Sequence, residues 1–290
     1  EIGGIGVDRD DNVYLFNRSE HPMIVLDRNG EFLRSWGEGM FPRPHGVHVA
    51  PDNTIWLTDD GDHTVRHCTL DGQVLLTLGV SGQPAPFMSG RPFNRPTHSA
   101  LSPSGEIYVS DGYGNARVHK FAPDGRHILS WGASGSGPGE FNLVHKICCD
   151  ADGWIYVADR ENHRIQVFDG NGRYQTQWNN LHRPCALWMP PGPKPVAFVG
   201  ELGPGMAFNA QFPNLGPRIS ILDNDGKLLS RFGALHPGLG PDSFIAPHGI
   251  AVDSRGDLYV GEVSFTQWSL YWEGSAPADL RCFRKFRRVA

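Results

Sequence analysis

One short unit recurs six times along this chain of 290 residues. Each copy has a short apolar strand, a turn rich in Asp, Gly or Pro, and a second strand that ends near a polar or acidic residue. Five copies read GGIGVDRDDNVYLFNR, PHGVHVAPDNTIWLTD, PTHSALSPSGEIYVSD, VHKICCDADGWIYVAD and PHGIAVDSRGDLYVGE, and a degenerate sixth, RPCALWMPPGPKPVAFVGE, starts at Arg183. Several copies continue into a third strand with an Asp-Gly hairpin, which is a strong turn signal.

The spacing of the copies predicts the fold. Their equivalent first positions are Gly3, His45, Thr97, His145, Cys185 and His248, which lie 42, 52, 48, 40 and 63 residues apart. Four strands per unit of about 40 to 50 residues are typical of a propeller blade. We therefore predict a single all-β domain over residues 1–290, a six-bladed β-propeller with a central channel. The alternative, a β-sandwich, does not suit so long a period.

Two stretches interrupt the repeat, at residues 202–217 (LGPGMAFNAQFPNLGP) and 266–280 (TQWSLYWEGSAPADL). We expect both to form loops over one face, where ligands sit in such scaffolds. Their aromatic residues suggest an apolar wall: Phe208, Phe212, Trp268, Tyr271 and Trp272. The last unit lacks an obvious fourth strand after LRCFRKFRRV, and we expect residues before Glu1 to supply it and close the ring.

The charge of the chain bears on its partners, and its cysteines bear on its cellular compartment. The formal net charge of −5 and the pI near 6.2 argue against nucleic acid or an anionic membrane, because both need a basic face. No apolar run reaches the ~18 residues of a membrane span. The chain begins without Met, so a removed leader stays open. Five cysteines without CxxC spacing favour free thiols in a reducing compartment, and hence a cytoplasmic location.

Three of the six first positions are histidines. The innermost strand of each blade begins at the channel, so its first residue should face the axis. Units two, four and six lie about 120° apart in a six-fold ring, so three imidazoles would converge and leave an open fourth position, as in catalytic zinc sites. We predict that His45, His145 and His248 bind a metal ion; the alternative is a set of hydrogen-bonded core histidines. His98, one residue past Thr97, is predicted to contact substrate or to support the site.

The second strands should end at the same face, with acids, two arginines and a tyrosine. Arg18 and Arg160 can hold a carboxylate by forked hydrogen bonds. Tyr113 follows Gly112 in a turn and can act as a base where a nearby cation lowers its pKa. The structural alternative is that the acids cap backbone amides and that the arginines pair with the acids.

Several segments resemble the lyase domain of the peptidylglycine amidating enzyme (peptidylamidoglycolate lyase), within the wider family of NHL-repeat propellers. The most specific are FNRSEHP, PHGV, PTHSALSPSGEIYVSDGYGNARV, GEFNLVHK, VADRENHRIQVF and APHGIAV, and the resemblance covers nearly the whole chain. It implies a catalytic zinc on the same three histidines, Tyr113 as the base, and Arg18 and Arg160 in substrate binding and catalysis.

The chain departs from that family at several positions. Gly249 stands where the family has an acid of a structural calcium site, which speaks against calcium at this place. The disulfides of the secreted lyases fall on Asn94 with Gly114 and on Tyr156 with Val167, and neither pair can form a bridge here. The departures point to an intracellular relative of bacterial type and leave the substrate open.

Three functions fit these observations. The leading hypothesis is a zinc-dependent lyase that cleaves the C–N bond of an N-acyl hemiaminal, an α-hydroxyglycine-like small molecule that carries a carboxylate. The second is a zinc-dependent propeller hydrolase or hydratase for an ester, lactone or carbonyl substrate; the histidines argue against calcium, which prefers oxygen ligands. The third is a non-catalytic NHL interaction scaffold, for which the acidic pI opposes RNA as a partner.

Overall fold

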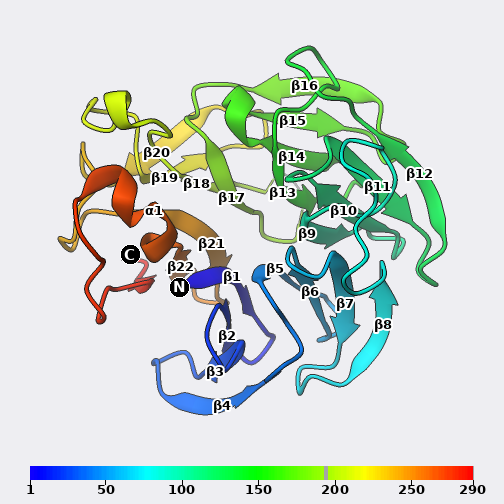
Figure 1. Cartoon of the computed structure of the whole chain (residues 1–290), viewed down its shortest axis with the longest axis horizontal. Coiled ribbons are helices and arrows are strands. Elements are labelled where there is room, and N and C mark those ends of the chain that lie inside the picture. Colours follow the sequence, from blue (N-terminus) through cyan, green and yellow to red (C-terminus); the bar gives the residue numbers. More distant parts are fainter. Residues whose placement is uncertain (193–194, 290) are drawn as a thin grey trace.

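The computed structural model describes residues 1–192 and 195–289 and shows six antiparallel sheets arranged in a ring around a central axis (Figure 1). Over the described residues, five sheets have four strands and the sixth has three, and strands follow chain order across every sheet. The predicted six-bladed propeller is therefore confirmed. The turn of the degenerate copy that starts at Arg183, which forms blade five, includes residues 193–194, which lie outside the described residues.

The first three blades share a four-stranded meander. Blade one contains β1 (Ile2–Val7), β2 (Val13–Asn17), β3 (Met23–Leu26) and β4 (Phe32–Trp36). Blade two contains β5 (Pro44–Val49), β6 (Ile55–Asp59), β7 (Thr64–Cys68) and β8 (Val74–Leu78). Blade three contains β9 (Pro96–Leu101), β10 (Ile107–Asp111), β11 (Arg117–Phe121) and β12 (His127–Trp131).

The remaining blades carry the helical segments as well. Blade four contains β13 (Val144–Cys149), β14 (Ile155–Asp159), the 3-10 helix η1 (Arg160–Asn162), β15 (Arg164–Phe168) and β16 (Tyr174–Trp178). Blade five contains β17 (Pro184–Trp188), β18 (Ala197–Glu201), the 3-10 helix η2 (Ala207–Asn209), β19 (Arg218–Leu222) and β20 (Leu228–Phe232). Blade six contains β21 (Pro247–Val252), β22 (Leu258–Glu262), α1 (Ser264–Tyr271) and β23 (Phe283–Phe286).

The first strands of the six blades line the axis. Each of β1, β5, β9, β13, β17 and β21 contacts the first strand of the next blade, and β21 returns to β1, which closes the ring. Blade six has three strands among the described residues, in line with the missing fourth strand expected from the sequence. That residues before Glu1 supply this strand stays a prediction.

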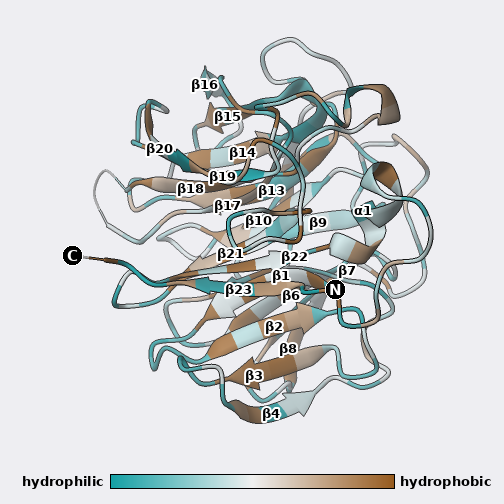
Figure 2. Cartoon of the chain, turned by 90° about the vertical axis from the view of Figure 1, so that its left-hand side faces the viewer, coloured by the Kyte–Doolittle hydropathy of each residue, from teal (hydrophilic) through white to brown (hydrophobic). Residues whose placement is uncertain are grey.

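Apolar side chains fill the space between neighbouring sheets. The second strands are covered on both sides, and all five residues of β6 and of β14 are buried. Between blades one and two, the ring of Phe16 packs edge-on against Phe41, with centroids 4.9 Å apart. Figure 2 shows most of the hydrophobic colour on the strands and most of the hydrophilic colour on the connecting loops.

One excursion differs from the expectation of loops. Residues 264–271 form helix α1, on which Trp268 is nearly buried and stacks on Trp272 with ring centroids 4.6 Å apart. This short helix is stable because its apolar side chains pack against Leu202 and Ile245. No helix among the described residues has the length and hydropathy needed to cross a bilayer. All five cysteines are free thiols.

Candidate metal centre

A β-bulge marks the start of every blade. In all six, the pairing between the first and second strands skips one residue of the first strand. The skipped residues are the six equivalent first positions: Gly3, His45, Thr97, His145, Cys185 and His248. A bulged residue has no partner on the neighbouring strand, and the bulge re-aims it. The six positions are thereby free to turn a side chain or a carbonyl toward the axis.

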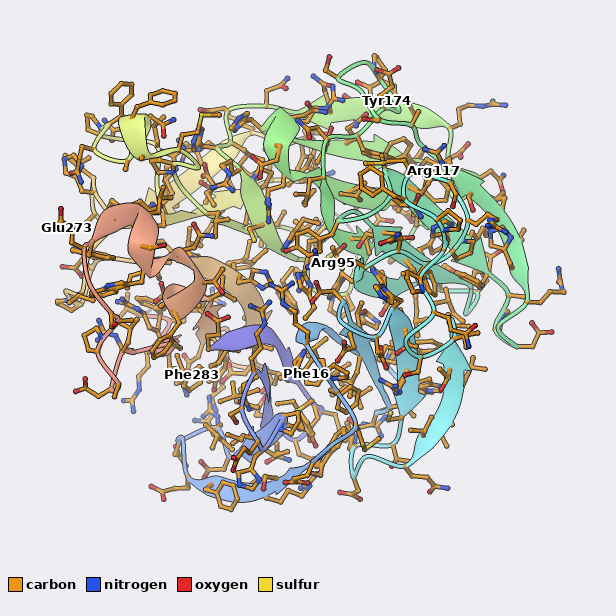
Figure 3. All side chains as sticks on the ribbon, viewed as in Figure 1. Phe16, Arg95, Arg117, Tyr174, Glu273 and Phe283 are labelled. Atoms are coloured by element: carbon orange, nitrogen blue, oxygen red, sulfur yellow. The ribbon has the colours of Figure 1, made fainter. Side chains whose placement is uncertain are left out.

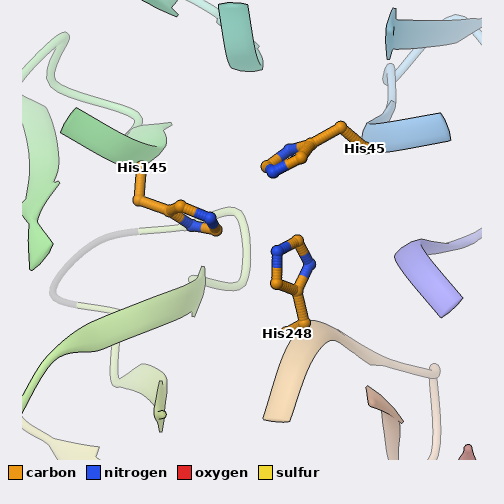
Figure 4. Close-up of side chains that lie close together, drawn as sticks. All are labelled: His45, His145 and His248. Carbon is orange, nitrogen blue, oxygen red and sulfur yellow. The ribbon is translucent and has the colours of Figure 1, made fainter. Parts of the chain in front are cut away.

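The three bulged histidines converge. Figure 4 shows the rings of His45, His145 and His248 directed toward one another from three strands. Their centroids lie 4.7 to 4.9 Å apart, and one nitrogen of each ring lies within 4.8 Å of the other two. All three side chains are buried. The predicted convergence of alternate blades is what the structure shows.

The other three bulges orient these rings. Each Nδ1 atom faces the backbone carbonyl of the bulged residue in the next blade. The pairs are His45 with Thr97 (2.6 Å), His145 with Cys185 (2.6 Å) and His248 with Gly3 (2.7 Å). Because a carbonyl only accepts, Nδ1 must carry the hydrogen, which leaves the lone pair of Nε2 available. Odd-numbered blades thus fix the tautomer of histidines from even-numbered blades.

The charge environment keeps the three imidazoles neutral. Burial lowers the pKa of His45, His145 and His248 well below its usual value, and the proximity of other cationic groups lowers it further. One such group is Lys146, beside His145, whose own pKa burial lowers to about 8. Neutral imidazoles whose Nε2 atoms carry a lone pair suit zinc and similar first-row ions. The three residues can therefore hold a metal ion, and zinc stays a prediction.

Tyr113 borders this cluster. It follows β10, and its hydroxyl oxygen lies 3.1 Å from Nε2 of His45 and 3.2 Å from Nε2 of His145. The hydroxyl can donate to only one of these nitrogens at a time. Burial raises the pKa of Tyr113 above its ordinary value, and the positive charge of Arg160 opposes that rise. The arrangement places an acid–base group against two of the predicted ligands.

Arg160 lies beside Tyr113 at the start of η1. Its guanidinium carbon is 5.8 Å from the centroid of the Tyr113 ring. Its Nε donates to Glu161 at 2.7 Å, and Glu161 also receives two hydrogen bonds at 3.0 Å from Arg183. Glu161 therefore holds the guanidinium of Arg160 beside the ring of Tyr113.

Arg18 approaches the cluster from the end of β2. Its Nε donates to the carbonyl of Pro44, the residue before His45, at 3.2 Å. Its Nη1 forms an ion pair with Glu1, which also accepts two hydrogen bonds from Thr266. The charge of Arg18 lowers the pKa of His45 and His248, so the guanidinium lies close enough to influence the centre.

The side chain of His98 contacts neighbouring strands and does not join the cluster. Its two ring nitrogens face backbone carbonyls of neighbouring inner strands, Val47 at 2.8 Å and Ile147 at 3.0 Å. It is buried and bridges β5 and β13 across β9. The predicted contact with substrate is not supported by these interactions, because no polar atom of the side chain is left for a ligand; a role in holding three blades together fits instead.

The acids that end the second strands are structural. Each is fully buried and accepts a hydrogen bond from a backbone N–H that enters the first strand of its own blade. The pairs are Asp59 with Arg43, Asp111 with Asn94, Asp159 with Asn142, Glu201 with His182 and Glu262 with Ile245. For these five residues the alternative of capped amides fits the structure.

Sequence reasoning missed two arginines at the site, Arg43 and Arg95, which both bind one of the acids at the end of a second strand. Asp60, which is fully buried, accepts hydrogen bonds from Arg43 at 3.0 Å and from Arg95 at 2.7 Å. The guanidinium carbon of Arg95 lies 4.8 Å from the centroid of the Tyr113 ring, nearer than that of Arg160. A signal was present, since an Arg-Pro pair opens the first strand in blades two, three and five.

Comparison with known proteins shows which family the chain belongs to. The family model described as NHL repeat matches residues 141–168, which run from just before β13 to the end of β15. NHL repeat-containing protein 3 of Mus musculus is 30% identical over 290 residues, covering 92% of this chain and 78% of that protein. The chain belongs to the NHL-repeat family.

A second relative of this NHL-repeat protein carries the name of an enzyme. Peptidyl-alpha-hydroxyglycine alpha-amidating lyase 1 of Drosophila melanogaster is 31% identical over 266 residues, covering 84% of this chain and 47% of that protein. The chain thus spans about half the length of that relative, and 56% of human NHL repeat-containing protein 3. The resemblance drawn from the sequence motifs is confirmed by these relatives.

Solved structures agree on the architecture. A streptogramin B lyase structure superimposes with a TM-score of 0.62 and 15% identity, covering 100% of this chain and 83% of that one. At this identity the likeness shows the fold alone.

Proposed function

We propose that this NHL-repeat protein is a zinc-dependent lyase that cleaves the C–N bond of an N-acyl hemiaminal, a substrate of the α-hydroxyglycine type. The observation that carries the proposal is the position of the Tyr113 hydroxyl, 3.1 and 3.2 Å from Nε2 of His45 and His145. A proton acceptor beside the ligands of a cation is what removal of a hydroxyl proton requires.

Three neutral imidazoles would hold the zinc ion, and the fourth coordination position would stay open for the substrate. The ion would supply Lewis acidity toward an oxygen of the substrate. A cation among these rings also favours the phenolate of Tyr113, the form that accepts a proton, against the effect of burial. The fit rests on the donor set, since each Nδ1 is already occupied by a carbonyl.

The reaction moves one proton and breaks one bond. Tyr113 accepts the proton of the substrate hydroxyl, the oxygen lone pair forms a C=O bond, and the C–N bond breaks with its electrons on nitrogen. Tyr113 passes the same proton to that nitrogen, which gives a primary amide and restores the phenolate, and the other product is an aldehyde such as glyoxylate. Arg160, held by Glu161, stabilises negative charge that develops at the oxygen or on an adjacent carboxylate. Arg18 adds positive charge from the opposite blade.

The relatives support the enzyme class without deciding it. Identities near 30% relate the chain both to proteins named for the NHL repeat alone and to proteins named as amidating lyases. The geometry of the three histidines and Tyr113 is the reason to favour the lyase. The free cysteines lead us to propose a reducing compartment for the protein.

Product analysis tests the proposal. Purified protein with its metal content measured is incubated with N-benzoyl-α-hydroxyglycine, and benzamide and glyoxylate are quantified. We expect both products in equal amounts, and loss of activity on chelation with recovery on zinc addition. Turnover of an ester or lactone panel without amide release would favour the hydrolase instead. Protein that purifies without stoichiometric metal and turns over neither class would be an interaction scaffold.

A further inference from the structure

Two arginines occupy equivalent places in neighbouring odd-numbered blades. Arg95 and Arg183 each precede the proline that opens the first strand, and both adopt left-handed backbone angles, with φ of 60° and 51°. The backbone N–H of each donates to Nδ1 of a histidine in the preceding blade, His63 at 3.0 Å and His163 at 3.1 Å. The two positions are copies of one structural device, so their side chains can be compared directly.

The side chain of Arg183 is fully used by the fold. It is buried, it binds Glu161 through Nε and Nη2, and its Nη1 donates to the carbonyls of Gly203 and Pro204 in the insertion of blade five. Every nitrogen of the guanidinium therefore has an acceptor, and the insertion covers it. Such an arginine holds loops together and leaves no donor for a ligand.

The side chain of Arg95 is only partly used. Within the described residues its sole side-chain hydrogen bond runs from Nη2 to Asp60, and 39% of the side chain is exposed. Nε and Nη1 have no acceptor there, although the guanidinium is held over the Tyr113 ring. Figure 3 shows Arg95 near the centre of the ring of blades.

Asp60 anchors a surplus of positive charge. It is fully buried and one of its oxygens serves both Arg43 and Arg95, so two guanidiniums share one carboxylate. Its second oxygen is buried without a hydrogen-bond partner in the described part of the chain. Buried polar atoms rarely stay unpaired, so a donor such as a water molecule is expected to satisfy this oxygen, while the two guanidiniums keep donors for another acceptor. Two half-exposed cations beside a reaction centre attract an anion, in a protein whose net charge is −5.

We propose that Arg95, assisted by Arg43, binds a carboxylate of the substrate distinct from the one beside the reacting carbon. The substrate would then be a dicarboxylate whose acyl part carries a second negative charge. This inference rests on the proposed function for the position of the reacting carbon. It assigns Arg95 as a specificity-determining residue, because a guanidinium with free Nε and Nη1 donors recognises carboxylates through charge-assisted hydrogen bonds.

Equilibrium binding separates this site from catalysis. The metal-loaded protein is titrated by calorimetry with N-succinylglycine and with N-butyrylglycine, which differ only in a distal carboxylate or methyl group and cannot react. We expect the succinyl compound to bind about tenfold more tightly, the size of one charge-assisted hydrogen bond. Arg95→Gln should abolish the preference, and Arg95→Lys, which keeps the charge, should retain part of it.

Arg34→Gln is the matched control. The side chain of Arg34 is 37% exposed, pairs with Asp71 and lies 5.9 Å from the ring of Tyr14, but it belongs to β4 on the outside of blade one. This variant should keep the full preference. Equal binding of the two compounds by the unaltered protein, or a preference that survives in folded Arg95→Gln, overturns the proposal. If the unaltered protein prefers the succinyl compound but releases no amide from hydroxylated compounds, the proposed lyase is overturned and the anion site remains.

Discussion

A backbone carbonyl fixes the tautomer of each histidine of the centre. Thr97, Cys185 and Gly3 accept the Nδ1 hydrogens, so the Nε2 atoms are the donors that remain. The sequence could place the three histidines, because the repeat alignment puts them at one equivalent position. It could not show the carbonyl acceptors, because any residue type has a carbonyl, nor the Asp60 group, because Arg95 meets Tyr113 only in the folded ring.

Loss of one ligand tests the centre at this scale. We expect His145→Ala to purify with less than a tenth of the metal of the unaltered protein, because removal of one of three ligands leaves two neutral donors. Elemental analysis measures this directly. His127→Ala, which removes an exposed histidine of β12, should keep its metal. Equal metal content in both variants would show that the ion, if present, binds elsewhere.

Removal of one hydroxyl tests the base. Tyr113→Phe should lower kcat by about 10²- to 10⁴-fold, the usual contribution of a positioned acid–base group, and should leave the metal content unchanged. Steady-state kinetics with N-benzoyl-α-hydroxyglycine provide the measurement. Tyr174→Phe in β16, on the outer part of blade four, serves as the control. A kcat within threefold of the unaltered protein would remove Tyr113 from the mechanism.

At the scale of the element, the bulge is the feature that builds the site. Strand alternation alone would send consecutive residues to opposite faces, and the bulge releases one residue toward the axis. The sequence predicted the strands well because period-two patterns and Asp-Gly turns are local signals. It missed α1 for two reasons. Eight residues are too few for a clear helical pattern, and the helix is stabilised mainly by the tertiary packing of Trp268.

The turn before Tyr113 packs closely against β13, and a substitution at Gly112 tests whether the site depends on this contact. A Cβ atom at Gly112 would lie 1.7 Å from the carbonyl oxygen of Val144, which precedes His145. Gly112→Ala must therefore displace β13 or the turn, and we expect a loss of about 1–3 kcal/mol in the free energy of unfolding, together with reduced kcat.

Gly240→Ala is the matched control, because its Cβ would meet only Oγ of Ser243, at 3.6 Å. Chemical denaturation of both variants gives the comparison. If Gly112→Ala proved as stable and as active as Gly240→Ala, the close approach of the two strands would not be a constraint on the site.

For the whole molecule, the buried histidines link stability to pH. Burial lowers the pKa of His45, His98, His145 and His248 well below 6.5 in the folded state. The unfolded chain therefore binds more protons below pH 6.5, so stability is fully present above that pH and is lost as pH falls toward the folded pKa values.

We expect the metal-free protein to lose up to about 1.4 kcal/mol per pH unit for each such histidine as pH falls below 6.5, and to change little above it. Denaturant unfolding of chelator-treated protein from about pH 7.5 to about pH 5 measures this. The same series with zinc restored should show higher stability at neutral pH. A flat profile of the metal-free protein across this range would contradict the neutral, buried state of the four rings.

The alternation of histidines and carbonyls around the axis also restricts how such a ring can change in evolution. Each imidazole needs a carbonyl acceptor on the neighbouring blade, and each such carbonyl is already matched to one imidazole. Duplication or deletion of a single blade would leave two rings, or two carbonyls, side by side and break the matching. The pairing of each imidazole with a carbonyl of the next blade therefore requires an even number of blades, and three such pairs require six.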